Sequence, residues 1–306
     1  MSQATEEARS NAGAAVQPLL QADWELDYYS RPILEPDGKK RWELLICSTP
    51  LVGSSQARFR FALNCPASSV NSQWLKQALE QALEQAGREG FAPPRKLRCW
   101  RASMRTMVQR ASEQLGLELI PSRRCYALVE WLQERQLQVY PKQEGYMAGP
   151  LAPAPLPIQP VAVPLPEAAR GDSWSWASLP LGALREAAEW DVSFAGLVPL
   201  EGFGDDEAMV SGLRLFSAGR SLAIAGLIAG LEPVRLEVCE RQLVLEAGLE
   251  DRWLLGNLAA EEAEAAAQAF SAAREQAGGV QFLAVQSSET QAGFDGFWVL
   301  RDLPDA

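Results

Sequence analysis

WELDYYSRPILEPDGKKRWELLICS, residues 24–48, is the stretch that decides how the first half of the chain folds. Its two outer parts, Trp24–Leu34 and Arg41–Ser48, are rich in aromatic and aliphatic residues and favour β-strands. Between them, EPDGK at Glu35–Lys39 is typical of a tight turn, because proline presets one backbone angle and glycine accepts a positive φ. The stretch therefore predicts a β-hairpin.

Strands and helices alternate after this hairpin. Arg58–Cys65 alternates as a third strand, and Asn71–Ala86 repeats its apolar residues at helical spacing behind Asn71 or Ser72 as N-cap. Further along, the pattern predicts a strand at Arg95–Arg101, a helix at Ser103–Leu115 stopped by Gly116, a strand at Leu117–Ile120 and a helix at Tyr126–Gln136. The resulting order, β-β-β-α-β-α-β-α, predicts a mixed sheet covered by helices. The same order occurs in ribonuclease H-like folds, which is an analogy of fold alone.

The second half of the chain predicts a similar mixture. Its expected strands are 173–181, 235–239, 242–246, 253–258, 281–286 and 296–301, and its expected helices are 184–190, 220–231 and 261–276. We therefore expect the α/β class in its mixed α+β form, with two domains that each consist of a mixed β-sheet flanked by helices.

A proline-rich segment separates the two halves. Ala148–Arg170 holds seven prolines among Ala, Leu and Val, which is typical of an extended, semi-rigid linker. The alternative is a loop packed along the surface of one merged domain. We expect a disordered tail at 1–21, a basic domain at 22–147, the linker at 148–170 and an acidic domain at 171–306.

Composition excludes several kinds of chemistry. The chain has 306 residues and no histidine, so Ser-His and Cys-His catalysis and histidine-metal sites are excluded. Five cysteines without a CxxC pair indicate thiols rather than disulfides or a zinc site. We expect no cofactor. The longest apolar run, Leu222–Leu231, is too short to cross a membrane, and Met1–Gln17 resembles no signal peptide, so we expect a cytoplasmic protein.

Charge is divided unevenly along the chain. The net charge is -11, but residues 1–150 hold 19 Lys and Arg against 16 Asp and Glu, whereas residues 151–306 hold 9 against 23. Within the first half, Arg88–Arg124 has nine basic and three acidic residues. An anionic partner is therefore expected to bind this segment.

The basic segment contains a candidate RNA site. Strand and helix ends in an alternating α/β domain meet at one edge of the sheet, and arginine binds phosphates while tryptophan stacks on unpaired bases. The alternative is a solvated face with the tryptophan in the core. The candidate residues are Arg95, Lys96, Arg98, Trp100, Arg101, Arg105, Arg123 and Arg124.

Two further clusters have both a functional and a structural interpretation. Glu25, Asp27 and Glu43 on facing strands could surround Mg²⁺ in a nuclease. The structural interpretation, which we favour, is that they are strand-surface carboxylates neutralised by the neighbouring Lys39–Arg41. At the other end of the chain, alternation at Phe297–Leu300 predicts a strand with at least one face in the core. The alternative is that these aromatic residues form a surface that binds a ligand.

Four blocks of this sequence resemble the Tab-type translation factors of cyanobacteria and chloroplasts. These are A/U-rich RNA-binding proteins required to translate photosystem messages. The blocks are Trp24–Leu34 with Gly38–Glu43; Arg98–Met107; Pro121–Arg124 with Trp131–Arg135 and Val139–Pro141; and Gly296–Arg301.

The resemblance implies that the protein binds the A/U-rich leader of photosystem subunit messages, performs no catalysis, contacts the translation machinery and associates peripherally with thylakoids. A Trp-Leu-Leu tripeptide near the C-terminus is associated with RNA binding in the family. The matching position here is Trp298-Val299-Leu300, where valine replaces the first leucine. The resemblance thus adds Trp298, Val299 and Leu300 to the candidate RNA-binding residues.

The sequence leaves three functions to distinguish. The leading hypothesis is a non-enzymatic protein that binds single-stranded A/U-rich RNA and promotes translation of photosystem messages. A second is a magnesium-dependent nuclease that uses Glu25, Asp27 and Glu43. The third is an adaptor whose acidic half binds a basic protein of the translation machinery.

Overall fold

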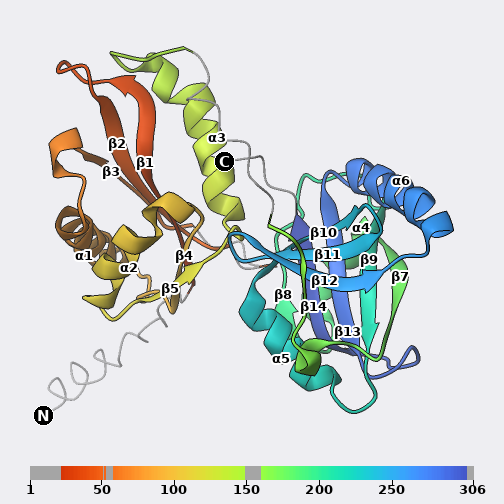
Figure 1. Ribbon diagram of the computed structural model, residues 1–306. Coiled ribbons are helices and arrows are strands. Elements are labelled where there is room, and N and C mark those ends of the chain that lie inside the picture. The colour runs from red at the N-terminus through yellow and green to blue at the C-terminus, as the bar shows by residue number, and fades with distance from the viewer. Residues whose placement is uncertain (1–21, 51, 53–57, 149–159, 302–306) are drawn as a thin grey trace, which may run out of the picture.

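The computed structural model describes residues 22–50, 52, 58–148 and 160–301, with the side chain of residue 262 left out. It shows two mixed α/β domains side by side (Figure 1). The predicted fold class is therefore confirmed. The expected tail, 1–21, and the linker residues 149–159 lie outside the described residues.

The N-terminal domain is built on one five-stranded sheet with the order β3-β2-β1-β4-β5. The strands β1, β2 and β3 are antiparallel, and β4 and β5 run parallel to β1. This confirms the predicted order β-β-β-α-β-α-β-α. The elements are β1 (Trp24–Leu34), β2 (Lys40–Ser48), β3 (Arg60–Cys65), α1 (Ser72–Arg88), β4 (Lys96–Cys99), α2 (Arg105–Glu113), β5 (Glu118–Pro121) and α3 (Tyr126–Gln138), with short 3-10 turns at Ala67–Ser69, Ala102–Met104 and Tyr140–Lys142.

Helices cover both faces of this sheet, with α1 and α2 on one side and α3 on the other (Figure 1). Alternation along the strands divides their side chains between the two faces. Leu44 and Ile46 of β2 pack in the core under α1, whereas Leu45 and Cys47 pack under α3. Asn71 caps α1 by accepting a hydrogen bond from the Trp74 backbone N–H at 2.9 Å, and Gly116 after α2 has a φ of 68°.

The C-terminal domain packs two sheets together with helices. One sheet has the order β7-β9-β13-β14-β8, and the other has the order β10-β11-β12-β6. The elements are β6 (Val163–Pro164), β7 (Ser173–Pro180), α4 (Leu181–Arg185), β8 (Val192–Gly196), β9 (Met209–Phe216), α5 (Ser221–Leu231), β10 (Pro233–Cys239), β11 (Gln242–Ala247), β12 (Asp251–Asn257), α6 (Ala260–Gln276), β13 (Val280–Gln286) and β14 (Phe294–Arg301), with 3-10 turns at Glu167–Ala169 and Ala187–Glu189.

The five-stranded sheet lies in the middle of this domain and is buried on both faces. On one face, Leu283 and Leu300 pack with α5, α6 and the second sheet. On the other face, Phe282 and Val299 pack with α4 and with Tyr126, the first residue of α3 in the N-terminal domain. The N-terminal domain therefore contributes a side chain to the core of its neighbour.

The last part of the expected linker packs on the C-terminal domain. Strand β6 pairs in parallel with β12, and Leu165 and Ala169 are buried. Residues 160–170 consequently belong to the folded part of the chain.

Besides β6, two strands and one helix differ from the expected pattern. The expected helix 184–190 is a one-turn helix, α4, followed by a 3-10 turn, and strands β8 and β9 were not predicted. Strand β9 reads MVSGLRLF, and serine and glycine weaken its strand pattern. Glycine is needed there because a Cβ at Gly212 would lie 2.5 Å from the Phe282 ring and from its carbonyl oxygen.

Candidate nucleic-acid interface

Arg98 joins the two domains. It lies on β4, and its guanidinium donates to both carboxylate oxygens of Glu232 at 2.7 and 3.1 Å and to Asp23 at 3.1 Å. Ser122 donates a further hydrogen bond to Glu232 at 3.0 Å. Burial opposes ionisation of Glu232, but the hydrogen bond and charge of Arg98 outweigh it and lower the pKa of this carboxyl.

Glu232 reaches this position because of its backbone conformation. It follows the last residue of α5 and has a φ of 57°, which few residues other than glycine adopt. The left-handed residue ends the helix and leads directly into β10, which begins at Pro233. The carboxylate at this helix end therefore faces the N-terminal domain.

Arg123 and Arg124 are also held by the C-terminal domain. Arg124 is buried, and its guanidinium donates to the backbone carbonyls of Pro233, Gly196 and Val299. Arg123 donates to Glu246 at 2.7 Å. The two arginines that follow β5 thus connect the domains through charge-assisted hydrogen bonds.

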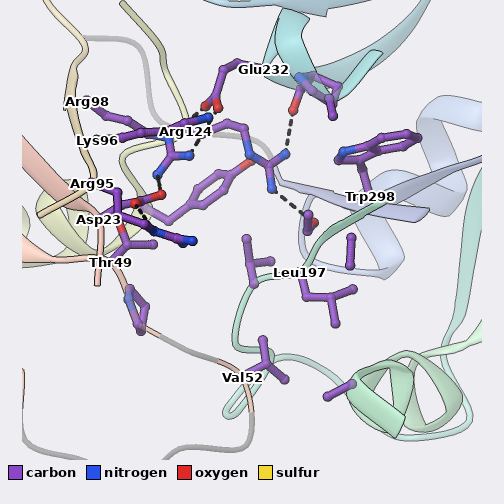
Figure 2. Close-up of a pocket in the computed structure, with 18 of the residues that line it drawn as sticks. Asp23, Thr49, Val52, Arg95, Lys96, Arg98, Arg124, Leu197, Glu232 and Trp298 are labelled. Atoms are coloured by element: carbon purple, nitrogen blue, oxygen red, sulfur yellow. Dashed lines mark hydrogen bonds and ion pairs between the residues drawn. The ribbon is translucent and has the colours of Figure 1, made fainter. Parts of the chain in front are cut away.

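Trp298 lies on β14 in a slot made by two glycines. A Cβ at either Gly196 or Gly296 would overlap the indole ring. Only 3% of the side chain is exposed, yet it forms part of the wall of the space between the domains, and its nitrogen-bearing edge faces the Arg124 side (Figure 2). Its neighbours on the strand, Val299 and Leu300, are fully in the core.

The space between the domains is a cleft of about 670 Å³. Five of the eleven candidate RNA-binding residues line it, namely Arg95, Lys96, Arg98, Arg124 and Trp298. They come from β4 and the residue before it, from the loop after β5 and from β14, and their convergence is visible in Figure 2. The remaining lining residues are Asp23, Thr49, Pro50, Val52, Glu118, Tyr126, Ala188, Ala195, Gly196, Leu197, Val198, Ala229, Glu232 and Pro233.

The cleft has two chemically different sides. The N-terminal domain supplies Arg95, which is largely exposed, and Lys96, which is half-buried. The C-terminal domain supplies an apolar wall that includes Leu197, Val198 and Trp298. A ligand with an anionic part and a flat apolar part matches this arrangement, and a nucleotide has both.

The other candidate residues lie elsewhere. Trp100 is in the core under α3, where its indole nitrogen donates to Asp27 at 2.9 Å, so the core alternative holds for it. Arg101 pairs with Asp27 and lies over the Tyr29 ring. Arg105 is exposed on α2 and does not line the cleft. The expected single arginine patch is thus divided between a cleft, a buried cluster and a helix surface.

The three candidate carboxylates are buried, and arginines hold two of them, Asp27 and Glu43. Arg31 donates to Asp27 at 2.7 Å and to Glu43 at 3.0 Å, and it occupies the space between them. Arg101 also pairs with Asp27, and Arg135 with Glu43. Asp27 is fully buried, which disfavours its charge, but Arg31 and Arg101 outweigh the burial and lower its pKa. The expectation of strand-surface groups neutralised by Lys39–Arg41 is therefore wrong.

The positions of these arginines also argue against the nuclease hypothesis. Magnesium sites need carboxylate oxygens that are free to coordinate. Here Arg31 already holds the facing oxygens of Asp27 and Glu43, and Glu25 accepts a hydrogen bond from the Leu128 N–H at 2.8 Å at the start of α3. Within the described part of the chain, no group of three or more acidic or cysteine side chains is arranged to hold a metal ion.

Sequence reasoning named Trp298 but missed the other residues of the C-terminal wall of the cleft. Glu232, Gly196 and Leu197 carry no local motif, and Tyr126 was assigned only to a helix. A glutamate placed directly after an uncharged helix and before proline was the one available signal at Glu232, because glutamate is unusual as a helix stop.

All five cysteines are free thiols, as the sequence indicates, and burial raises the pKa of Cys47 and Cys125. No helix among the described residues has the length and apolar character needed to span a membrane.

Comparison with known proteins places both domains in one family. Residues 23–135 match the family described as "RNA-binding protein Tab2/Atab2 N terminal", and residues 153–301 match "RNA-binding protein Tab2/Atab2, C-terminal domain". A protein from Zea mays named "Protein TAB2 homolog, chloroplastic" is 35% identical over 94% of this chain and 74% of its own length. A protein of the same name from Arabidopsis thaliana is 33% identical over 92% and 75%. No solved structure matches the chain. The chain therefore belongs to the Tab2/Atab2 family of RNA-binding proteins.

Proposed function

We propose that the protein binds single-stranded A/U-rich RNA in the cleft between its domains. The observation that carries this proposal is that Arg95, Lys96 and Trp298 line the same cleft. More than 200 sequence positions separate Trp298 from the two basic residues. Membership of an RNA-binding family supports the class of ligand.

Arg95 and Lys96 are the phosphate-binding groups of this proposal. Arg98 donates from all three guanidinium nitrogens to carboxylates, and Arg124 donates to backbone carbonyls, so neither is free to bind a phosphate. Arg95 has only a long ion pair of 3.7 Å to Asp23. Arg98 and Arg124 instead hold the two walls in position and add positive potential.

An unpaired base is accommodated by the apolar wall. Leu197 and Val198 supply apolar surface, and Trp298 supplies an indole edge that can donate a hydrogen bond. A/U-rich RNA suits a cleft of this kind because it forms little self-structure and its bases unstack easily. Asp23, Glu118 and Glu232 also line the cleft, and Arg98 neutralises two of them, Asp23 and Glu232.

The biological role we propose follows from this ligand. The protein acts without catalysis on the leaders of photosystem subunit messages and promotes their translation. The two relatives named as chloroplastic support a photosynthetic setting. We place the protein in the cytoplasm of a cyanobacterial cell, with peripheral contact to thylakoids and to the translation machinery.

A salt titration tests the cleft. Affinity for an A/U-rich and a G/C-rich single strand is measured by fluorescence anisotropy at several salt concentrations. Each lost phosphate contact reduces the slope of log affinity against log salt by about 0.7, so Arg95→Ala/Lys96→Ala should reduce it by about 1.4. The control is Arg88→Ala/Arg110→Ala, which removes the same charge from exposed helix positions outside the cleft. Equal effects of the two double variants would refute binding in the cleft.

A second measurement separates binding from cleavage. End-labelled A/U-rich RNA incubated with the protein and Mg²⁺ or Mn²⁺ should remain intact. Cleavage that is abolished by Asp27→Asn would restore the nuclease hypothesis despite the arginines around that carboxylate.

A further inference from the structure

Two tryptophans form an aromatic corner far from the cleft. Trp174 and Trp176 lie on β7, which is an edge strand, and because they are two residues apart they point to the same face. Trp176 is 39% exposed, although tryptophan is normally well buried in a folded domain. The corner lies where β7 and the end of β12 meet α6 (Figure 1).

The two indoles form walls at nearly a right angle. Their ring centroids are 5.4 Å apart with an interplanar angle of 85°, and Trp176 also contacts Phe270 of α6 at 5.3 Å. Trp174 is fixed against the backbone, since a Cβ at Gly256 would lie 2.7 Å from its indole nitrogen. The walls enclose a pocket of about 410 Å³ that is completed by Ser175, Asn257, Leu258, Ala259 and Ala266.

The charge around this pocket is negative. The described residues that line it carry no charge of either sign, so the neighbouring residues set the potential. Helix α6 starts directly after the wall residue Ala259, and Glu261 and Glu264 of its first two turns are exposed. The half of the chain that contains the pocket has 23 acidic against 9 basic residues. Such surroundings attract cations and repel phosphate.

The wall geometry also favours a cation over a nucleobase. Perpendicular indoles offer no pair of parallel faces between which a base could stack, whereas a cation needs only one π face. Together with the acidic surroundings, this distinguishes the pocket from the cleft, whose lining includes the exposed cation Arg95.

We propose that the Trp174–Trp176 pocket binds an arginine or lysine side chain of a basic protein segment. The proposal is independent of RNA binding in the cleft. It gives the acidic domain a partner of defined chemistry, so that the chain can hold RNA at one site and a basic protein at another.

The test uses the full-length protein and a fluorescein-labelled nine-residue peptide of alternating arginine and lysine. Trp176→Leu keeps an apolar side chain but removes the π face, and it should weaken peptide binding by about 3- to 10-fold. Trp176→Phe should give an intermediate affinity. The matched control is Phe194→Leu, which changes a comparably exposed aromatic residue on the opposite edge strand, β8, and should leave peptide affinity unchanged.

The alternatives give different results. Equal peptide affinity of the wild type and Trp176→Leu would mean that the peptide binds the acidic surface without using the pocket, and would overturn the proposal. If Trp176→Leu weakened A/U-rich RNA binding and left peptide binding unchanged, the pocket would be a base-stacking site instead. Arg95 and Lys96 do not line this pocket, so Arg95→Ala/Lys96→Ala should leave peptide affinity unchanged. The RNA titration and the peptide titration therefore test the two proposals independently.

Discussion

At the scale of the residue, Arg31 shows why a basic residue in the sequence is a poor guide to a basic surface. It is 2% exposed and pairs with Asp27 and Glu43. Arg98, Arg101 and Arg124 are likewise committed to acceptors within the protein. Strand alternation places the acidic residues of β1 on the face of the sheet that α3 covers. Arginines that lie on the same buried face pair with these carboxylates and are therefore not available at the surface.

Removal of Arg31 should destabilise the protein strongly. Arg31→Met leaves two buried carboxylates with fewer partners, and breaking such a buried pair costs about 3 kcal/mol or more. Urea unfolding followed by circular dichroism measures this loss. Lys39→Met is the comparison, because its pair with Asp37 is exposed on both sides and is screened by water. Similar losses for both variants would contradict the role given to Arg31.

Glu25 should make stability depend on pH. Burial raises the pKa of Glu25 to about 7 from 4.5, against the opposing hydrogen bond from Leu128. The folded state therefore binds a proton that the unfolded state has released between pH 4.5 and 7, so stability falls as the pH rises through this window. A shift of this size corresponds to at most about 3 kcal/mol, at roughly 1.4 kcal/mol for each pH unit.

Glu25→Gln should flatten this dependence, because the amide does not titrate. The free energy of unfolding is measured from pH 5 to 8 for the wild type, for Glu25→Gln and for Glu84→Gln, which changes an exposed carboxylate on α1. A wild-type slope that survives in Glu25→Gln would assign the pH dependence to other groups.

At the scale of the element, β14 shows how glycines on neighbouring strands make room for one large side chain. Its residues alternate between the two cores of the C-terminal domain, with Phe297 and Val299 in one and Trp298 and Leu300 in the other. The predicted alternation is thus correct, and both faces rather than one are buried. Because Gly196 of β8 and Gly296 of β14 lie against the indole, Trp298 is held at the cleft in a fixed orientation.

Gly196→Ala should therefore disturb both stability and the cleft. The added methyl group overlaps Trp298, and overpacking of this kind costs about 1–3 kcal/mol. Gly87→Ala is the matched control, since nothing lies within 4 Å of a Cβ there and alanine favours a helix by about 0.4–1 kcal/mol. Thermal unfolding and the near-ultraviolet tryptophan signal measure the two variants. A Gly196→Ala protein as stable as Gly87→Ala would show that the slot can relax.

At the scale of the whole molecule, the two domains are joined by a continuous set of contacts rather than by a linker alone. Glu232 receives Arg98 and Ser122, Tyr126 enters the C-terminal core, and Arg123 pairs with Glu246. Burial of Glu246 is outweighed by Arg235 and Arg123, which lower its pKa. These contacts fix the width of the cleft, so the proposed RNA site depends on them.

A double-mutant cycle tests this connection. Arg98→Ala and Glu232→Ala should each lower stability, and their coupling energy should be about 1–3 kcal/mol because the two side chains share two hydrogen bonds. Unfolding is followed by two probes, far-ultraviolet circular dichroism and tryptophan fluorescence. The single variants should also unfold less cooperatively, since the domains become less dependent on each other. Additive effects within 0.5 kcal/mol would contradict the proposed link.

The sequence by itself determined the elements of the N-terminal domain, most of those of the C-terminal domain and the class of fold, together with the free thiols and the absence of histidine chemistry. Trp24–Leu34 and its turn, the cap at Asn71 and the stop at Gly116 act over a few residues, and local patterns report them correctly. A local pattern is not sufficient to predict an element whose sequence is set by a distant neighbour. Strand β9 is the example, because Phe282 leaves no room for a side chain at Gly212 and the glycine weakens the strand pattern.

Only the tertiary structure decided which cations are available and where the two halves of the candidate site meet. The sequence shows that Arg95, Lys96, Arg98 and Arg124 are basic, but their partners lie up to 175 positions away. Whether an arginine faces solvent or a carboxylate is decided by side chains that long-range packing brings together. The cleft exists for the same reason, because its two walls belong to domains that are far apart in the sequence and are placed against each other by Glu232 and Tyr126.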